Sequence, residues 1–149
     1  VLLDDGAAIT DSTAILNYLG DKHQALTYPC ATLDRARQDA MTHFILDEMD
    51  ALLWTAARHS FILPQERRVP EIKDSLKWEF ETSVARLVTR LGDGPYLMGD
   101  MMTVPDILAA HCGSWAKAAK FPVENAAFED YLDRMRARPA YARALAREG

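Results

Sequence analysis

Apolar residues recur at steps of three and four positions along most of this chain, a spacing that places them on one face of a helix. The longest such stretch begins after Thr32, a plausible N-cap, and weakens near His59. Other stretches stop at glycine or proline, such as Gly92 and Pro122. The pattern therefore predicts a bundle of about five helices, at residues 32–59, 70–91, 103–120, 128–135 and 139–147.

The N-terminal stretch follows a different pattern. Two short apolar runs, at residues 1–4 and 8–10, flank Asp5-Gly6. That dipeptide is typical of a tight β-turn, because glycine adopts positive φ without strain. A β-hairpin is therefore expected, followed by a helix with Thr10 as its N-cap and Gly20 as the residue that ends it.

Between these two regions lies a polar segment that contains Pro29 and has no helical period. It predicts a linker at residues 25–31, between a first unit at 1–24 and a helical unit at 32–149. The chain opens within an apolar run and its first residue is Val1 rather than Met. We therefore expect that further residues precede it in the natural protein.

Candidate chemistry appears where the hairpin meets the first helix. The N-terminus of a helix presents unpaired N–H groups and a partial positive charge, which suit a carboxylate. Asp11 and Ser12 stand at that point, and the Ser12 hydroxyl adds a hydrogen-bonding group. The alternative is that these residues only cap the helix. Farther on, Thr103 and Asp106 have the spacing of a capping box, which is a structural role.

Composition excludes several classes of protein. Among 149 residues, 49% are hydrophobic and the formal net charge is −5, so a core is expected and a nucleic-acid partner is not. No apolar run is long enough for a membrane span, and no signal peptide is recognisable. Two cysteines without C-x-x-C spacing fit a reducing cytoplasm, and no His/Cys/Asp/Glu cluster predicts a metal.

Three separated segments resemble the glutathione S-transferase family, in the order the family has them. GDMMTVPDI, at 99–107, resembles the signature that opens the central helix of the family's all-helical domain. LDRMRARPAYARAL, at 132–145, is similar to its closing helices, and VLLDDGAAITDSTAILNYL, at 1–19, to the end of its thioredoxin-like domain. The resemblance is greatest to bacterial, beta-class enzymes. It implies a mainly α fold, an all-helical domain preceded by a partial thioredoxin-like domain of a β-hairpin plus one helix.

The resemblance also implies site residues. Ser12 would bind the γ-glutamyl carboxylate of glutathione, and Asp11 would face the γ-glutamyl ammonium group. Weaker candidates for the glutathione or substrate pocket lie on the long helix: His43, Asp47, Glu48 and Asp50. A hydrophobic pocket between the two units would be lined by Met49, Trp54 and His111; the alternative is that each is a plain core residue, as large side chains at helical spacing usually are. No residue of this chain is assigned a catalytic role and no metal is expected.

The implied function is transfer of glutathione to a small hydrophobic electrophile, in detoxification or stress metabolism, by a cytoplasmic homodimer. The family's thiol-activating residue and cis-proline have no counterpart here, so these 149 residues alone are expected to show little or no activity. One alternative is a non-catalytic dimerisation or interaction module of the same fold. The other, without the resemblance, is a helical regulatory domain.

Overall fold

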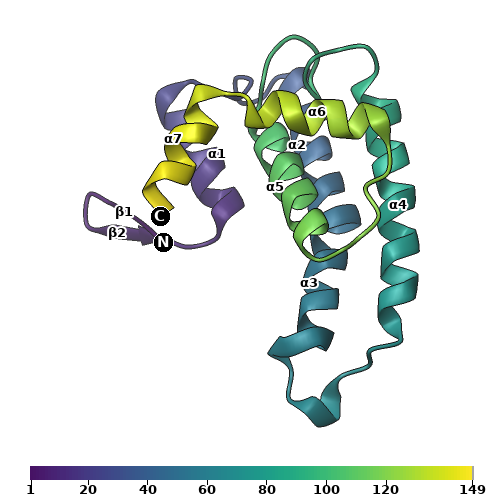
Figure 1. The fold of residues 1–149 in the computed structure, drawn as a ribbon. Helices are drawn as coiled ribbons and strands as arrows, with labels where there is room; N and C mark the ends of the chain where they lie inside the picture. Colours follow the sequence, from purple (N-terminus) through teal and green to yellow (C-terminus); the bar gives the residue numbers. More distant parts are fainter. Residues whose placement is uncertain (149) are drawn as a thin grey trace.

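The computed structural model describes residues 1–148 and shows a helical bundle beside a smaller unit (Figure 1). The smaller unit holds a two-stranded antiparallel sheet and α1, and the C-terminal helix α7 contacts α6. The mainly α fold expected from the sequence is confirmed. The elements are β1 (Leu2–Asp4), β2 (Ala7–Ile9), α1 (Ser12–His23), α2 (Leu33–Ile45), η1 (Leu46–Asp50), α3 (Ala51–Ala57), η2 (Arg58–Ile62), η3 (Gln65–Arg67), α4 (Ile72–Leu91), α5 (Val104–Ala118), α6 (Ala126–Arg136) and α7 (Pro139–Glu148).

The first helix differs from the sequence prediction at both ends. Its N-cap is Asp11 rather than Thr10, and it continues past Gly20 to His23. Gln24 ends it in the left-handed conformation, with φ 48°. Gly20 is instead buried inside the helix, where a Cβ atom would lie 3.2 Å from the carbonyl oxygen of Ala25. This glycine therefore permits a close approach of the returning chain and does not supply a positive φ.

The long helix predicted at 32–59 is confirmed, with Thr32 as its N-cap. It runs without a break through α2, η1, α3 and η2, so that α-helical turns alternate with π-helical turns. A π-turn carries hydrogen bonds from residue i to i+5 and shifts the phase of every side chain that follows it. The η1 turn thus decides which face of the helix the residues after Leu46 occupy.

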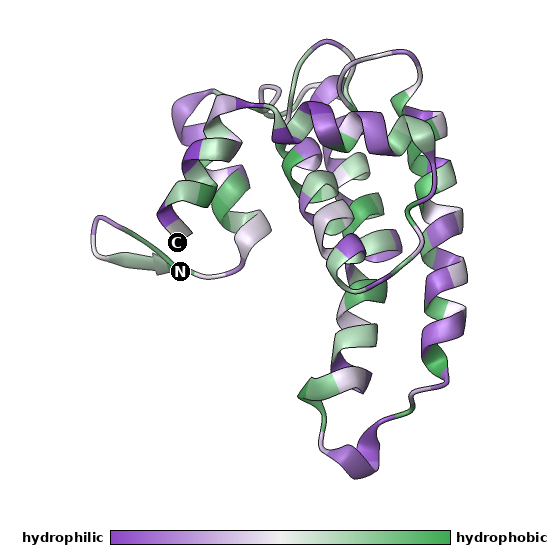
Figure 2. Cartoon of the chain, viewed as in Figure 1, coloured by the Kyte–Doolittle hydropathy of each residue, from purple (hydrophilic) through white to green (hydrophobic). Residues whose placement is uncertain are grey.

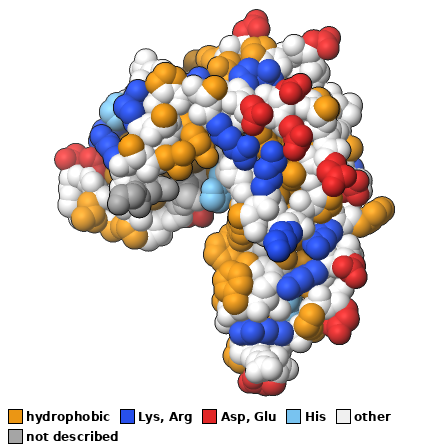
Figure 3. Space-filling view, viewed as in Figure 1, with side chains coloured by type: hydrophobic (Ala, Val, Ile, Leu, Met, Phe, Trp, Pro, Cys, Tyr) orange, Lys and Arg blue, Asp and Glu red, His pale blue; other side chains and the backbone are white. Residues whose placement is uncertain are grey.

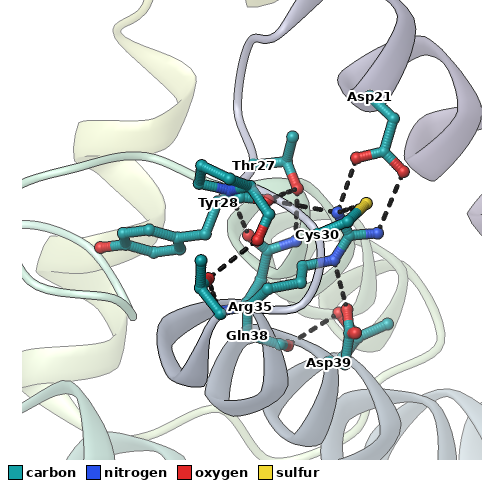
Figure 4. Close-up of polar contacts among 10 residues, drawn as sticks. Asp21, Thr27, Tyr28, Cys30, Arg35, Gln38 and Asp39 are labelled. Atoms are coloured by element: carbon teal, nitrogen blue, oxygen red, sulfur yellow. Dashed lines mark hydrogen bonds and ion pairs between the residues drawn. The ribbon is translucent and has the colours of Figure 1, made fainter.

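The N-terminal end of the long helix is tied to α1 by Arg35 (Figure 4). Its guanidinium group donates two hydrogen bonds to the carboxylate of Asp21, at 2.6 and 3.2 Å, and a third to Asp39 at 3.0 Å. It also donates to the carbonyl of Tyr28 in the linker. A bidentate pair of this kind fixes orientation as well as distance, and the Arg35 charge lowers the pKa of Asp21.

The buried Gln38 side chain completes this junction from the next turn of α2. Its carbonyl oxygen accepts from the backbone N–H of Tyr28 at 3.0 Å, and its amide donates to the Thr27 hydroxyl at 3.0 Å. A linker that sequence composition alone describes as irregular is therefore held to the bundle by specific hydrogen bonds.

The centre of the bundle is α5, which packs against α2 and α6. Hydrophobic residues line the region where α2, α3 and α5 meet (Figure 2). Gly113 lets α6 come close, because a Cβ atom there would lie 2.6 Å from Leu132 and 3.1 Å from Phe128. The side chains of Phe80, Phe128, Tyr131 and Leu132 are fully buried in the core.

The buried N-terminus of α5 is held by a capping box of Thr103 and Asp106. The Asp106 carboxylate accepts hydrogen bonds from the N–H of Thr103 at 2.8 Å and from the Thr103 hydroxyl. It also accepts from the N–H of Leu97 and the hydroxyl of Tyr131, both at 2.9 Å. Burial raises the pKa of Asp106, and these hydrogen bonds oppose that rise. One side chain thereby joins the 95–99 turn, α5 and α6.

Replacing Asp106 by Ala should lower the free energy of unfolding by roughly 3 kcal/mol or more, because several buried donors lose their acceptor at once. Urea denaturation monitored by circular dichroism measures this. Asp100→Ala, at an exposed carboxylate earlier in the chain, is the matched control and should change the free energy of unfolding little. A D106A protein as stable as the D100A protein would contradict the role assigned to this side chain.

Candidate functional site

The N-terminal end of α1, called its mouth below, begins at a residue with a strained backbone conformation. Asp11 is the N-cap and has φ 73°, a region that non-glycine residues seldom occupy. Its Oδ1 atom accepts from the N–H of Ala14 at 2.8 Å, and its carbonyl accepts from Ile15 at 3.1 Å. Strain of this kind is found most often where the backbone must present groups to a ligand.

Ser12 follows at the first helical position and is exposed. The N–H groups of Ser12 and Thr13 precede the first hydrogen bond of the helix, so they remain free to bind an acceptor. Together with the Ser12 hydroxyl they form an outward-facing set of donors at the positive end of the helix dipole. This geometry suits a carboxylate. One residue at this position does cap the helix, as the alternative interpretation of the sequence held, and that residue is Asp11.

A second carboxylate, that of Asp50, faces the same region from the long helix. It is half-buried, and burial is the main cause that raises its pKa. The charge of Asp11 raises it further, whereas His111 opposes the rise. The Cys112 thiol lies 3.9 Å from Asp50 Oδ1 and donates to it. The charges of Asp11, at the start of α1, and of His111, on α5, thus both act on Asp50 of η1.

An apolar cavity of about 520 Å³ opens next to these groups, between the end of the long helix and α5. Trp54 lies one turn beyond Asp50, and its ring meets that of Trp115 edge to face at 5.2 Å. His111 lies 6.0 Å from the same ring of Trp115. The cavity is lined by Trp54, Ala57, Phe61, Ile62, His111, Ser114 and Trp115.

The space-filling view shows a histidine and a group of hydrophobic side chains along the edge of the bundle that faces the hairpin and α1 (Figure 3). A polar helix mouth and an apolar cavity therefore neighbour each other. That combination suits a ligand with one charged end and one apolar end.

Known proteins that are similar to this chain include glutathione S-transferases. No family model matches the chain. It is 26% identical over 154 residues to glutathione S-transferase GstA of Escherichia coli O157:H7, an alignment that spans all of this chain and 72% of that protein. Among solved structures, the ternary complex of BphK, a bacterial glutathione S-transferase, superposes with a TM-score of 0.87 at 23% identity. A sphingomonad glutathione S-transferase complexed with glutathione superposes with a TM-score of 0.80 at 25% identity. Each superposition covers all of this chain and 72% of the other.

Along its whole length this chain resembles glutathione S-transferases, in sequence and in fold. The resemblance inferred from three sequence segments is confirmed, and so is the fold that it implied. The hairpin and α1 correspond to part of a thioredoxin-like domain, and the bundle to the helical domain.

The four weaker site candidates on the long helix lie in two different places in the structure. Asp50 alone faces Asp11 and α5. His43, Asp47 and Glu48 instead line a different, open cavity beside Arg90. Glu48 is paired there with Arg86 of α4 at 3.1 Å. The structure therefore does not bring these three residues to the mouth of α1.

The three residues considered for an apolar pocket lie in different surroundings. Trp54 and His111 line the cavity between the long helix and α5, whereas Met49 is fully buried in the core. For Met49 the structure therefore shows the core position that was the alternative to a pocket. Sequence reasoning missed Trp115 and Phe61. One sequence signal could have found Trp115. His111 and Trp115 are four residues apart, as are Asp50 and Trp54, and residues at this spacing lie on the same face of a helix.

Neither cysteine of this chain offers a reactive thiolate at the mouth of α1. Cys112 is buried, and burial together with the charge of Asp50 raises its pKa to about 12. It stays protonated at neutral pH and acts as a hydrogen-bond donor. Cys30 is exposed in the linker, beside Arg35 and away from the mouth of α1. Within residues 1–148 no group of His, Cys, Asp and Glu is arranged to hold a metal ion, and no helix there could span a membrane.

Asp50→Asn should make the protein more stable at neutral pH. The folded-state pKa of Asp50 lies above the ordinary value of 3.8, so its charged form is disfavoured in the folded protein. The wild type therefore loses stability relative to the variant as pH rises through that pKa, and the difference should vanish below pH 3.8. Urea denaturation at several pH values measures it. Asp47→Asn, at an exposed carboxylate on the same helix, is the matched control; an identical pattern in both variants would refute the assignment.

Proposed function

We propose that this protein is a glutathione transferase in which Ser12 and the open amides of α1 bind the γ-glutamyl carboxylate of glutathione. The observation that carries this proposal is the exposed N-terminus of α1, where the Ser12 hydroxyl stands beside two N–H groups that precede the first hydrogen bond of the helix. The glutathione held in the sphingomonad relative supports it. Asp11, whose Oδ1 caps the helix, offers its second oxygen to the ligand's ammonium group.

The electrophile is assigned to the apolar cavity of Trp54, His111 and Trp115. Its walls are aromatic and it opens beside Asp50, so an apolar acceptor held there lies next to the carboxylate-binding mouth of α1. The role of this chain is to bind and orient the two reactants, which raises the rate by fixing their geometry. We assign activation of the thiol to neither cysteine.

The wider setting of this proposal rests on the family. We infer a cytoplasmic homodimer that conjugates small electrophiles in detoxification or stress metabolism. The competing proposal is a non-catalytic module of the same fold, which would retain the scaffold without using the α1 mouth. Binding of glutathione separates the two.

Ser12→Ala should weaken glutathione binding about tenfold, because it removes one hydrogen bond to a charged carboxylate. Isothermal titration calorimetry on the purified protein measures the dissociation constant. Ser75→Ala, an exposed serine on α4, is the matched control and should leave the affinity unchanged. Equal affinities in the S12A and wild-type proteins would exclude the proposed pocket, and no binding in either would favour the non-catalytic module.

Trp54→Ala should reduce the advantage of S-hexylglutathione over glutathione, because only the hexyl group reaches the cavity. Loss of one aromatic wall removes roughly 50–60 Å² of apolar contact, or about 1.4 kcal/mol, which is a tenfold change in that ratio. Titration with both ligands measures it. Trp78→Ala, at an exposed tryptophan on α4 outside the cavity, should leave the ratio intact. If W54A weakened both ligands equally, the electrophile would have to bind elsewhere.

A further inference from the structure

A second, smaller cleft lies on the side of the bundle where the end of the long helix meets the start of α4 and the end of α5. Its volume is about 270 Å³. The floor is apolar and includes Phe61, Trp115 and Phe121. Three lysines line the same cleft: Lys73 and Lys77 of α4, and Lys120, which follows α5. Basic side chains gather on the face of the molecule where these helices meet (Figure 3).

The charges of this cleft are unbalanced. None of its lining residues is acidic, and none of the three lysines forms an ion pair within residues 1–148. Lys73 and Lys77 are four residues apart on one helix, so like charges face each other there at a cost in stability. In a chain of net charge −5, this local excess of positive charge is unusual. A bound anion would relieve the repulsion.

The apolar floor restricts which anion fits. Phe121 is buried and packs edge to face against Phe80 at 5.5 Å, which makes the floor rigid. Inorganic phosphate would satisfy the lysines but leave this floor in contact with water. An aliphatic or aromatic body attached to the anionic group would cover it. The volume is slightly below the usual range for drug-sized ligands, so the body must be short.

We propose that this cleft binds a small amphipathic carboxylate, with the carboxylate group among Lys73, Lys77 and Lys120 and a short apolar chain against Phe61, Trp115 and Phe121. The site is distinct from the cavity assigned to the electrophile, which contains Trp54 and His111 but no lysine. Phe61 and Trp115 belong to the wall between the two. The proposal does not depend on glutathione binding.

Octanoate is a suitable probe, and 1-octanol is its uncharged counterpart with the same chain. Calorimetric titration of the wild-type protein in the presence of saturating S-hexylglutathione should show one octanoate site per chain. Octanoate should bind about tenfold or more tightly than 1-octanol, and raising the salt concentration should narrow that difference because exposed charges are screened. Equal binding of the two probes, or displacement of octanoate by S-hexylglutathione, would overturn the proposal.

The double variant Lys73→Gln/Lys77→Gln should weaken octanoate binding about tenfold and leave 1-octanol binding unchanged, since it removes two of the positive charges that attract the carboxylate. Lys117→Gln is the control. It removes one positive charge at the end of α5, but Lys117 is paired with Glu129 and does not line the cleft. Circular dichroism checks that all variants fold. Full octanoate affinity in the double variant would show that the lysines do not form the site.

Discussion

The rest of the structure depends on a helix that begins inside the protein. The first N–H groups of any helix lack partners within it, and burial makes an unpaired donor costly. At α5 the demand is met by residues distant in the sequence. The N–H of Val104 donates to the carbonyl of Leu26 in the linker at 2.9 Å, and Thr103 and Asp106 cap each other. Pro105 has no N–H, so one donor fewer at this helix end needs an acceptor. The cap therefore fixes α5 against both the linker and α6.

This constraint also places the candidate site. Once α5 is fixed, His111, Cys112 and Trp115 face the long helix, where Asp50 and Trp54 lie one turn apart. Arg35 and Gln38 hold the end of α1 and the linker to the same long helix. The mouth of α1 is thus positioned relative to the apolar cavity by contacts outside the site. Within it, Asp50 carries a desolvated carboxylate and Asp11 a strained backbone, and both are unfavourable for stability. Local features that oppose stability are common where a protein binds its ligand.

The electrostatic surroundings differ between the cavity assigned to the electrophile and the lysine-lined cleft. Carboxylates of Asp11 and Asp50 lie near the cavity assigned to the electrophile, and lysines surround the smaller cleft behind it. Trp115 and Phe61 line both.

The sequence by itself determined the helical bundle, the hairpin, the long helix after Thr32 and the resemblance to glutathione S-transferases, because these follow from local periodicity, turn chemistry and short motifs. Only the tertiary structure decided where α1 ends, because Gly20 serves a contact with Ala25 that no local signal reveals. It also decided that Asp50, and not His43, Asp47 or Glu48, faces α1. Successive helical residues differ by about 100° in direction, and a π-turn changes that phase. Which carboxylate faces the site thus depends on packing that the sequence pattern does not encode.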